Sequence, residues 1–260
     1  MMKTNYHTHH YLCGHATGNV EQYIQEAIKN KFDEIGVSDH GPINAEAFHR
    51  MTYDEFKNIY LVELEDAIKK YSDKIKILKG LEIEYIKGDE KYYKHLLEFV
   101  DYLILGPHYY ITEKVLNGHT AYQVKTHEQL LSYTKMIEEA LDTKLFKIIA
   151  HPDLFMHGYK EFDSFAEECT KRIVEAIIRN DVLIEFNAGG IRNNRYFDEN
   201  GIPNYAVPND EFWKVVSKYN VKVIIGSDCH RPEELNDDSF KYAKELAKTY
   251  GLNIVNSISE

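Results

Sequence analysis

The sequence predicts an α/β fold in which parallel strands and helices alternate around a barrel, forming one domain over residues 1–260. The first observation is that short β-branched runs alternate with longer amphipathic segments along the whole chain. The second is that the runs at 102–106 and 221–226 are almost continuously apolar, as in parallel strands buried on both faces. The third is the length of 260 residues, which suits a single α/β barrel of about 250 residues.

Seven strands are expected, each in a run of β-branched and other apolar residues. In chain order they are 5–9, 34–39, 75–84, 102–107, 147–150, 182–187 and 221–227. Six helices are expected between them, with a last helix at 233–250. This alternation favours a barrel over two separate domains.

Three of the expected helices begin with a capping box, in which Ser or Thr is followed three residues later by Glu or Gln. The pairs are Thr52 with Glu55, Thr126 with Gln129, and Ser164 with Glu167. The longest expected loops, at 41–51, 109–126 and 189–209, each follow the end of a strand. Such a barrel places the walls of its active site in these loops.

Composition and charge exclude several classes of protein. The 42 acidic and 31 basic side chains give a net charge of -11, the wrong sign for binding a long nucleic acid. No stretch approaches the roughly 18 apolar residues of a membrane span, and the N-terminus lacks an apolar targeting segment. The three cysteines, Cys13, Cys169 and Cys229, are too few and too far apart for a disulfide framework. We therefore expect a cytoplasmic protein.

Six of the seven expected strands end in residues that commonly bind metal ions. Because the carboxyl ends of parallel strands meet at one mouth of a barrel, residues more than 200 positions apart can converge there. Burial of carboxylates such as Glu82 and Asp228 is also costly without a counter-cation. The candidate ligands are His7, His9, His15, His40, Glu82, His108, His151, Asp228 and His230. Nine N and O ligands are too many for one ion, and ligands of this type suit Zn, Mn or Fe.

These strand ends, from residue 7 to residue 230, resemble the successive motifs of the polymerase and histidinol phosphatase (PHP) superfamily. Within it, the stretches Ala150-His-Pro-Asp-Leu and Glu185-Phe-Asn-Ala-Gly-Gly-Ile-Arg look most like histidinol-phosphate phosphatases. The resemblance implies a distorted barrel of seven βα units that holds three divalent metal ions. It assigns His7, His9, Glu82 and Asp228 to the first ion, Glu82, His108 and His151 to the second, and His15, His40 and His230 to the third.

A phosphate-ester hydrolase of this kind would use two ions about 3.5–4 Å apart to activate a bridging hydroxide for attack on phosphorus. Glu82, Asp228 and His230 are the catalytic candidates, with Glu82 as the bridge and His230 or Asp153 as a proton donor to the leaving alkoxide. Asp153 is also a candidate to bind the substrate's amine. The candidate phosphate-binding cations are Arg192 and then Lys160 and Arg195.

Three functions are compatible with the sequence. The favoured one is hydrolysis of L-histidinol phosphate to L-histidinol and phosphate in histidine biosynthesis, with a small phosphorylated substrate as the partner and neither a long nucleic acid nor a membrane. The second is a PHP-type phosphoesterase that acts on nucleotides or another small phosphomonoester. The third is a non-catalytic metal-binding protein, which would not need a bridging carboxylate with open coordination positions. The sequence does not indicate the oligomeric state.

Overall fold

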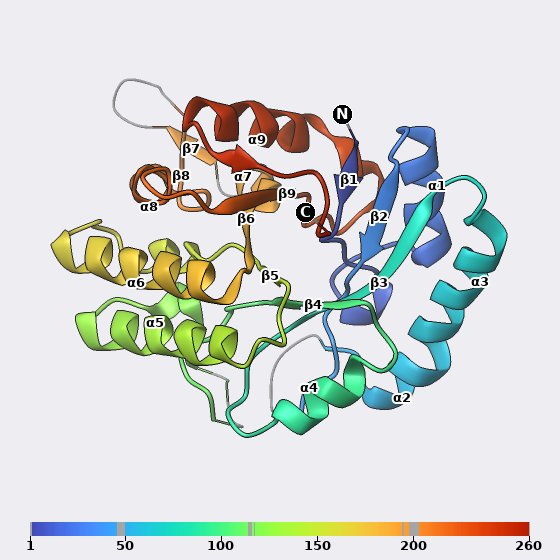
Figure 1. Ribbon diagram of the computed structural model, residues 1–260, viewed down its shortest axis with the longest axis horizontal. Coiled ribbons are helices and arrows are strands. Elements are labelled where there is room, and N and C mark those ends of the chain that lie inside the picture. The colour runs from blue at the N-terminus through green and yellow to red at the C-terminus, as the bar shows by residue number, and fades with distance from the viewer. Residues whose placement is uncertain are drawn as a thin grey trace.

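Eight parallel strands form one curled sheet, with helices around its outer face (Figure 1). The structure is a computed structural model and describes residues 2–45, 50–113, 116, 118–193, 195–197 and 203–259, with the backbone alone at 195–197 and 203–204. The strand order is β1-β2-β3-β4-β5-β6-β9-β10, and every adjacent pair is parallel. The strands are β1 Thr4–Asn5, β2 Glu34–Val37, β3 Lys76–Ile83, β4 Tyr102–Leu105, β5 Ile148–Ile149, β6 Leu183–Asn187, β9 Lys222–Gly226 and β10 Asn253–Ile254.

The helices follow the strands along the chain and pack their apolar stripes against the sheet. The longer ones are α1 Val20–Lys29, α3 Leu61–Tyr71, α4 Glu90–Leu96, α5 His127–Asp142, α6 Ser164–Asn180, α8 Asp210–Val216 and α9 Asp238–Thr249. Shorter pieces are α2 Tyr53–Glu55, α7 Ala188–Asn193, the π-helical turn η2 Phe56–Tyr60, and the 3-10 helices η1 Tyr11–Cys13, η3 Ala121–Gln123, η4 Leu154–His157 and η5 Pro232–Asn236. No helix among the described residues is long and apolar enough to cross a membrane.

The predicted parallel α/β barrel is confirmed, but its details differ. All seven expected strands are present, although β1 and β5 have only two residues each. The eighth strand, β10, was not predicted because two residues are too few for a periodic pattern. An antiparallel hairpin, β7 Arg195–Phe197 with β8 Pro203–Tyr205, also lies within the expected loop 189–209.

Two of the expected helices differ from the structure: α6 begins one residue earlier, and the expected last helix is in two parts. The capping boxes at Thr52 and Thr126 are present. At α6, however, the N-cap is Asp163, whose side chain accepts a hydrogen bond from the Ala166 backbone N–H. The expected helix 233–250 is divided into η5 and α9, because Asp237 takes an extended conformation between them and caps α9. Carboxylates are as effective as hydroxyls at N-caps, which is why the Ser/Thr pattern missed the N-cap of α6.

The barrel closes between β1 and β9 by two different means. At the carboxyl ends of the strands, Thr8 pairs in parallel with Cys229, and the Asp228 N–H donates to the His7 carbonyl at 2.9 Å. At the opposite end the C-terminal segment fills the seam: the Val255 N–H donates to Val223 O at 2.9 Å, and the Thr4 hydroxyl donates to Asn256 O at 2.6 Å.

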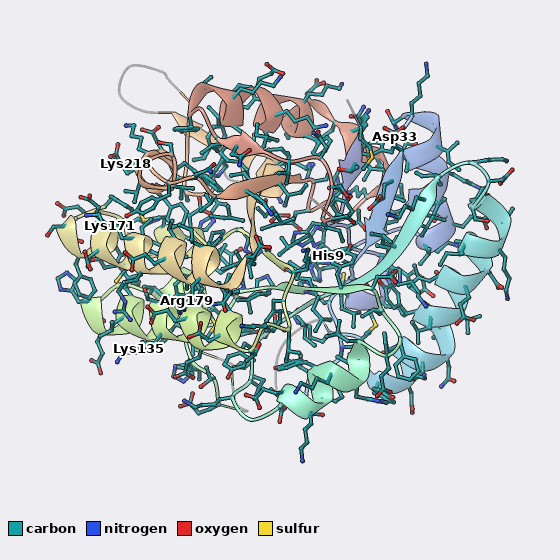
Figure 2. All side chains as sticks on the ribbon, viewed as in Figure 1. His9, Asp33, Lys135, Lys171, Arg179 and Lys218 are labelled. Carbon is teal, nitrogen blue, oxygen red and sulfur yellow. The ribbon has the colours of Figure 1, made fainter. Side chains whose placement is uncertain are left out.

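Side chains from the C-terminal segment also complete the barrel interior. Val255 and Ile258 pack there with Tyr6, Tyr102 and other inward-facing strand residues. Charged side chains such as Lys135 and Lys171 lie at the periphery, whereas His9 lies near the centre (Figure 2). The interior therefore has an apolar floor at one end and a polar mouth at the other.

Candidate active site

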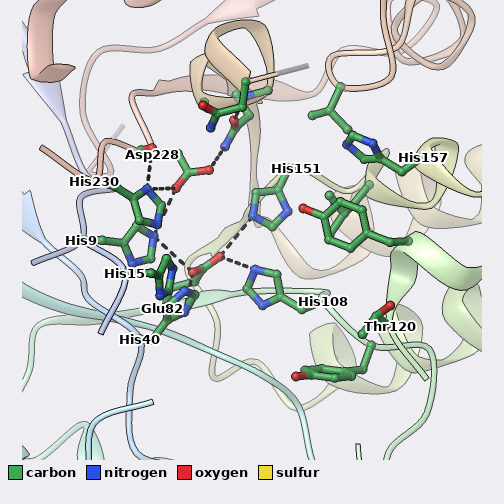
Figure 3. Close-up of a pocket in the computed structure, with 18 of the residues that line it drawn as sticks. His9, His15, His40, Glu82, His108, Thr120, His151, His157, Asp228 and His230 are labelled. Atoms are coloured by element: carbon green, nitrogen blue, oxygen red, sulfur yellow. Dashed lines mark hydrogen bonds and ion pairs between the residues drawn. The ribbon is translucent and has the colours of Figure 1, made fainter. Parts of the chain in front are cut away.

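The carboxyl ends of the strands surround a pocket of about 350 Å³ (Figure 3). Eight of the nine predicted metal ligands line it, and the ninth, His7, lies behind them with its Nε2 atom 3.5 Å from Glu82 Oε1. Two of these residues, His151 and Asp228, have positive φ angles of 28° and 46°. Such backbone conformations are strained for residues other than glycine and are often found at functional sites.

Glu82, near the end of β3, lies at the centre of the cluster. It is fully buried, and five imidazole nitrogens lie 3.0–3.5 Å from its two oxygens. The nearest on Oε2 is His40 Nδ1 at 3.0 Å, and the nearest on Oε1 is His151 Nε2 at 3.2 Å. Yet neither oxygen has a hydrogen bond of normal geometry with any described residue. A buried carboxylate without such a partner is unfavourable unless a cation neutralises it.

The two histidines of the His-x-His motif also point to a cation. His7 Nε2 and His9 Nε2 are 3.0 Å apart, and Asp228 Oδ1 is 3.2 Å from His9 Nε2. The outer nitrogen of each ring faces another carboxylate: His7 Nδ1 is 2.7 Å from Glu185, and His9 Nδ1 is 3.2 Å from Asp39. A ring that donates its outer N–H to a carboxylate presents a lone pair inward, as metal-ligating histidines do.

Three more histidines around the pocket have a partner for the outer ring nitrogen. His108 Nδ1 is 2.8 Å from Glu84 Oε1, His15 Nδ1 is 3.0 Å from the Cys13 carbonyl, and His230 Nδ1 is 3.3 Å from the Asp228 carbonyl. These contacts fix the orientation of each ring. They also explain why buried acidic residues such as Glu84 and Glu185 surround the pocket.

The candidate ligand atoms form several overlapping groups whose members lie within 4.8 Å of one another. The groups are His7, His9 and Glu82; His7, His151 and Asp228; His40, Glu82 and His108; and His9, His40 and His230. The His15 ring lies beside them, with its centroid 4.8 Å from that of His230 and 5.4 Å from that of His40. The donor set therefore fits more than one divalent ion, with Glu82 shared between groups.

Electrostatics in the cluster favour bound cations. Burial alone would raise the pKa of Glu82, but His108, His7 and His40 hold it well below its usual value. Burial alone would lower the pKa of His9, but hydrogen bonds to Asp228 and Asp39 raise it to about 9. Without ions the buried carboxylates therefore keep protons on neighbouring rings. Divalent ions would take the place of those protons.

The structure does not bring three of the four predicted substrate-binding residues, Arg192, Lys160 and Asp153, into the pocket. Arg192 donates from Nε to Asp237 at 2.6 Å and from its two terminal nitrogens to the carbonyls of Ser227 and Glu234. It therefore ties α7 to the segment after β9. Lys160 is exposed and outside the pocket lining. Arg195 begins β7, but its side chain lies outside the described part of the structure.

Asp153 has a structural position instead of a place in the pocket. It is buried, and its Oδ2 atom accepts from the Asn209 N–H at 2.7 Å and from Trp213 Nε1 at 3.1 Å. These bonds hold the start of α8. Asp153 and Arg192 were misplaced for the same reason: the sequence shows the charge of a side chain near a strand end but not the partner that it contacts.

His230 fits a ligand better than the predicted proton donor. Burial and the neighbouring His9 lower its pKa to about 4, so the ring is neutral at pH 7. A neutral imidazole offers a lone pair to a cation.

Several residues of the site were not predicted from the sequence. Arg50 lines the pocket and forms a nearly buried ion pair with Glu84. Asn187, at the end of β6, donates to Glu185 Oε2 at 2.8 Å and to Asp228 Oδ2 at 3.1 Å. The signal for both was their position, since Arg50 lies in an expected active-site loop and Asn187 ends an expected strand.

A parallel α/β barrel with a cluster of buried histidines and carboxylates at its carboxyl mouth is the architecture of a metal-dependent hydrolase. The sequence profile of the PHP domain matches residues 5–189, and the chain belongs to this family.

Over nearly its whole length the chain is similar in sequence and in structure to proteins named histidinol-phosphatases. It is 23% identical over 257 residues to a Deinococcus radiodurans protein named a probable histidinol-phosphatase, with 95% of this chain and 94% of that protein aligned. It is 23% identical over 271 residues to a Bacillus subtilis histidinol-phosphatase, with 89% and 94% aligned. In three dimensions it is similar to a Lactococcus lactis histidinol phosphate phosphatase complexed with Zn, L-histidinol and phosphate. That match has a TM-score of 0.71 and 18% identity, and it covers 97% of this chain and 95% of the other.

Proposed function

We propose that this chain is a cytoplasmic, metal-dependent phosphomonoesterase that hydrolyses L-histidinol phosphate to L-histidinol and phosphate, with residues 1–260 as one catalytic domain. The observation that carries the proposal is the fully buried Glu82, whose oxygens lie among five imidazole nitrogens without a hydrogen-bond partner among the described residues. The names of the relatives from Deinococcus radiodurans and Bacillus subtilis support this choice of substrate.

We propose three divalent ions, of Zn, Mn or Fe, held by the ligand sets that the family resemblance implies. His7, His9, Glu82 and Asp228 would hold one ion, Glu82, His108 and His151 a second, and His15, His40 and His230 a third. The overlapping groups of donor atoms around Glu82 support more than one ion, and the mixture of imidazole and carboxylate ligands suits these metals.

When bound, such ions supply the positive charge and the activation of water that hydrolysis of a phosphate ester needs. The protein's own contribution is to orient the ligands: Glu185, Asp39 and Glu84 hold the outer nitrogens of His7, His9 and His108.

Arg50 replaces Arg192 as the proposed phosphate contact. Among the described residues that line the pocket it is the only lysine or arginine, and its Nη2 atom lies 3.4 Å from His108 Nδ1. A guanidinium can bind two phosphate oxygens at once.

A phosphate-release screen tests the proposed function. The purified protein, reloaded with Zn²⁺, Mn²⁺ or Fe²⁺, is assayed with histidinol phosphate, nucleotides and sugar phosphates. We expect the highest kcat/KM with histidinol phosphate, and loss of activity in Glu82→Gln, which keeps the side-chain size but removes the charge. A preference for a nucleotide or a sugar phosphate would identify a different phosphoesterase, and no phosphate release would contradict a catalytic role.

A further inference from the structure

The pocket has a second wall that the metal ligands do not use. Figure 3 shows His157 and Thr120 across the pocket from His9, Glu82 and Asp228. We call this side the far wall and define it by the lining residues Tyr109, Thr120, Tyr122, Leu154, His157 and Val207. It combines aromatic and apolar groups with neutral polar groups. Such a surface suits the organic part of a substrate better than a phosphate dianion.

Two short helices hold the far wall in place. Tyr122 lies in η3 and His157 ends η4. The Ala121 N–H donates to His108 O at 2.7 Å, which fixes η3 to the end of β4. The two helices approach so closely at Gly158 that a Cβ atom there would lie 2.4 Å from Val124 O and 2.6 Å from Tyr122 O. As a result, the rings of His157 and Tyr122 lie together, with centroids 4.7 Å apart.

His157 carries a buried nitrogen without a partner. Its Nε2 atom has no hydrogen bond with any described residue. Burial lowers the pKa of His157 to about 4, and the positive charge of Lys160 adds to this effect. The ring is therefore neutral at pH 7, with one nitrogen that donates and one that accepts. Leaving such an atom unpaired costs free energy, so a ligand that pairs with it is favoured.

Tyr122 offers the complementary surface. It lines the pocket, and 52% of the residue's surface is exposed although one side of its ring lies against His157. Aromatic rings in such a position bind a second planar ring by offset or tilted stacking.

We propose that His157 and Tyr122 bind the leaving alcohol of the substrate and select one that carries a planar nitrogen heterocycle. Tyr122 stacks against that ring, and His157 forms a hydrogen bond with one of its nitrogens. A neutral imidazole ring has both a donor and an acceptor, so it can pair with His157 in whichever tautomer His157 adopts. This inference rests on the proposed phosphomonoesterase function and assigns the residues that would give it specificity.

A pair of matched esters isolates the role of His157. Histidinol phosphate and 2-amino-3-phenylpropyl phosphate share the chain, the amine and the phosphate, and differ only in the ring. We expect the wild type to favour histidinol phosphate by about tenfold to a hundredfold or more in kcat/KM. In His157→Leu this ratio should fall to within about threefold of one, since the hydrogen bond is lost. His127→Leu is the matched control, because His127 is exposed at the start of α5 and outside the pocket lining.

The role of Tyr122 is tested by the same esters together with ethyl phosphate, which has no ring. Tyr122→Leu should lower kcat/KM for both ring-bearing esters by about tenfold relative to ethyl phosphate. Tyr242→Leu, on the exposed surface of α9, is the control. An unchanged ring preference in His157→Leu would overturn the inference. An equal loss of kcat/KM on all three esters in His157→Leu would also overturn it, because that result would place His157 at the phosphate.

Product binding separates this inference from the proposed function. L-Histidinol and L-phenylalaninol are titrated by calorimetry into metal-loaded protein with inorganic phosphate present. If the protein does not hydrolyse histidinol phosphate but binds L-histidinol selectively through His157, the proposed function fails and the far-wall inference holds. If it hydrolyses histidinol phosphate and His157→Leu still prefers L-histidinol, the inference alone fails. If neither ligand binds selectively to the wild type, the inference fails as well.

Discussion

At the scale of single residues, the site contains two kinds of carboxylate. One kind faces the inner nitrogens of the histidine rings, and the other contacts their outer nitrogens. Glu82 faces inward, among five imidazole nitrogens, whereas Glu84 lies outside the ring of ligands and contacts His108 Nδ1 and Arg50. The two residues are separated by one position in the sequence and are both buried. The same substitution at each therefore distinguishes an inner ligand from a residue that orients a ligand.

Glu82→Gln should lower kcat on the order of a thousandfold and reduce the number of ions retained, because it removes the negative charge of the proposed shared ligand. Glu84→Gln should have a milder effect, a loss of about 10–100-fold in activity or metal affinity, since a glutamine can still accept a hydrogen bond from His108. Elemental analysis and steady-state kinetics measure both effects. Equal losses in the two variants would mean that Glu82 is not the shared ligand.

Arg50→Ala should reduce kcat/KM about 10–100-fold without loss of metal, because a charge-assisted contact to phosphate is removed. The reduction should be similar for every phosphomonoester that the enzyme accepts, since all share the phosphoryl group. A substrate-dependent reduction would instead place Arg50 next to the leaving alcohol.

At the scale of elements, the strand ends are held together by side chains that never reach the pocket. Arg192, on α7, binds Asp237 and two backbone carbonyls of the segment after β9. This segment carries Asp228 and His230. Arg192→Ala should lower the free energy of unfolding by about 1–3 kcal/mol, because it removes the hydrogen bonds that Arg192 donates to Asp237 and to the two carbonyls. Chemical denaturation measures this effect. A loss of kcat/KM with unchanged stability would return Arg192 to the phosphate site.

The pairing of β6 with β9 leaves no room for a side chain at Gly226, next to Glu185. A Cβ atom at Gly226 would lie 1.7 Å from Glu185 Oε1, the atom that contacts His7 Nδ1. Gly226→Ala should therefore displace Glu185 and weaken metal binding about 10–100-fold, as expected when an outer partner of a ligand is lost. Glu185→Gln should give a smaller effect, because it keeps the shape. Metal titration followed by calorimetry compares them, and wild-type affinity in Gly226→Ala would contradict this account.

At the scale of the whole molecule, the C-terminal segment closes the end of the barrel opposite the pocket. Ile258 is 8% exposed and packs inside the barrel. Ile258→Ala should lower the free energy of unfolding by about 2–4 kcal/mol through loss of buried surface and the cavity left behind. Urea denaturation measures the change. The number of ions bound by the folded protein should stay the same, and a loss of ions would show that the floor and the mouth of the barrel are coupled.

The sequence predicted the barrel and the convergence of the candidate ligands at its mouth because both depend on local patterns. Apolar runs mark the strands, and residues such as His108 and Asp228 follow those runs directly. The positions of Arg192 and Asp153 could not be predicted, because each is decided by contacts between segments that lie far apart in the chain. The strand β10 was missed for a similar reason: its two residues become a strand only by pairing with β9.

The seam between β1 and β9 has a consequence for the order in which the protein can mature. His7 and His9 lie near the start of the chain, whereas Asp228 and His230 lie near its end, and the bridge from Thr8 to Cys229 brings them together. On the ribosome the early ligands therefore emerge long before their late partners. A nascent chain that stops before residue 228 lacks part of the donor set. Ion retention should consequently appear only after residue 230 has been synthesised, which would make bound metal a marker of chains that contain both sides of this seam.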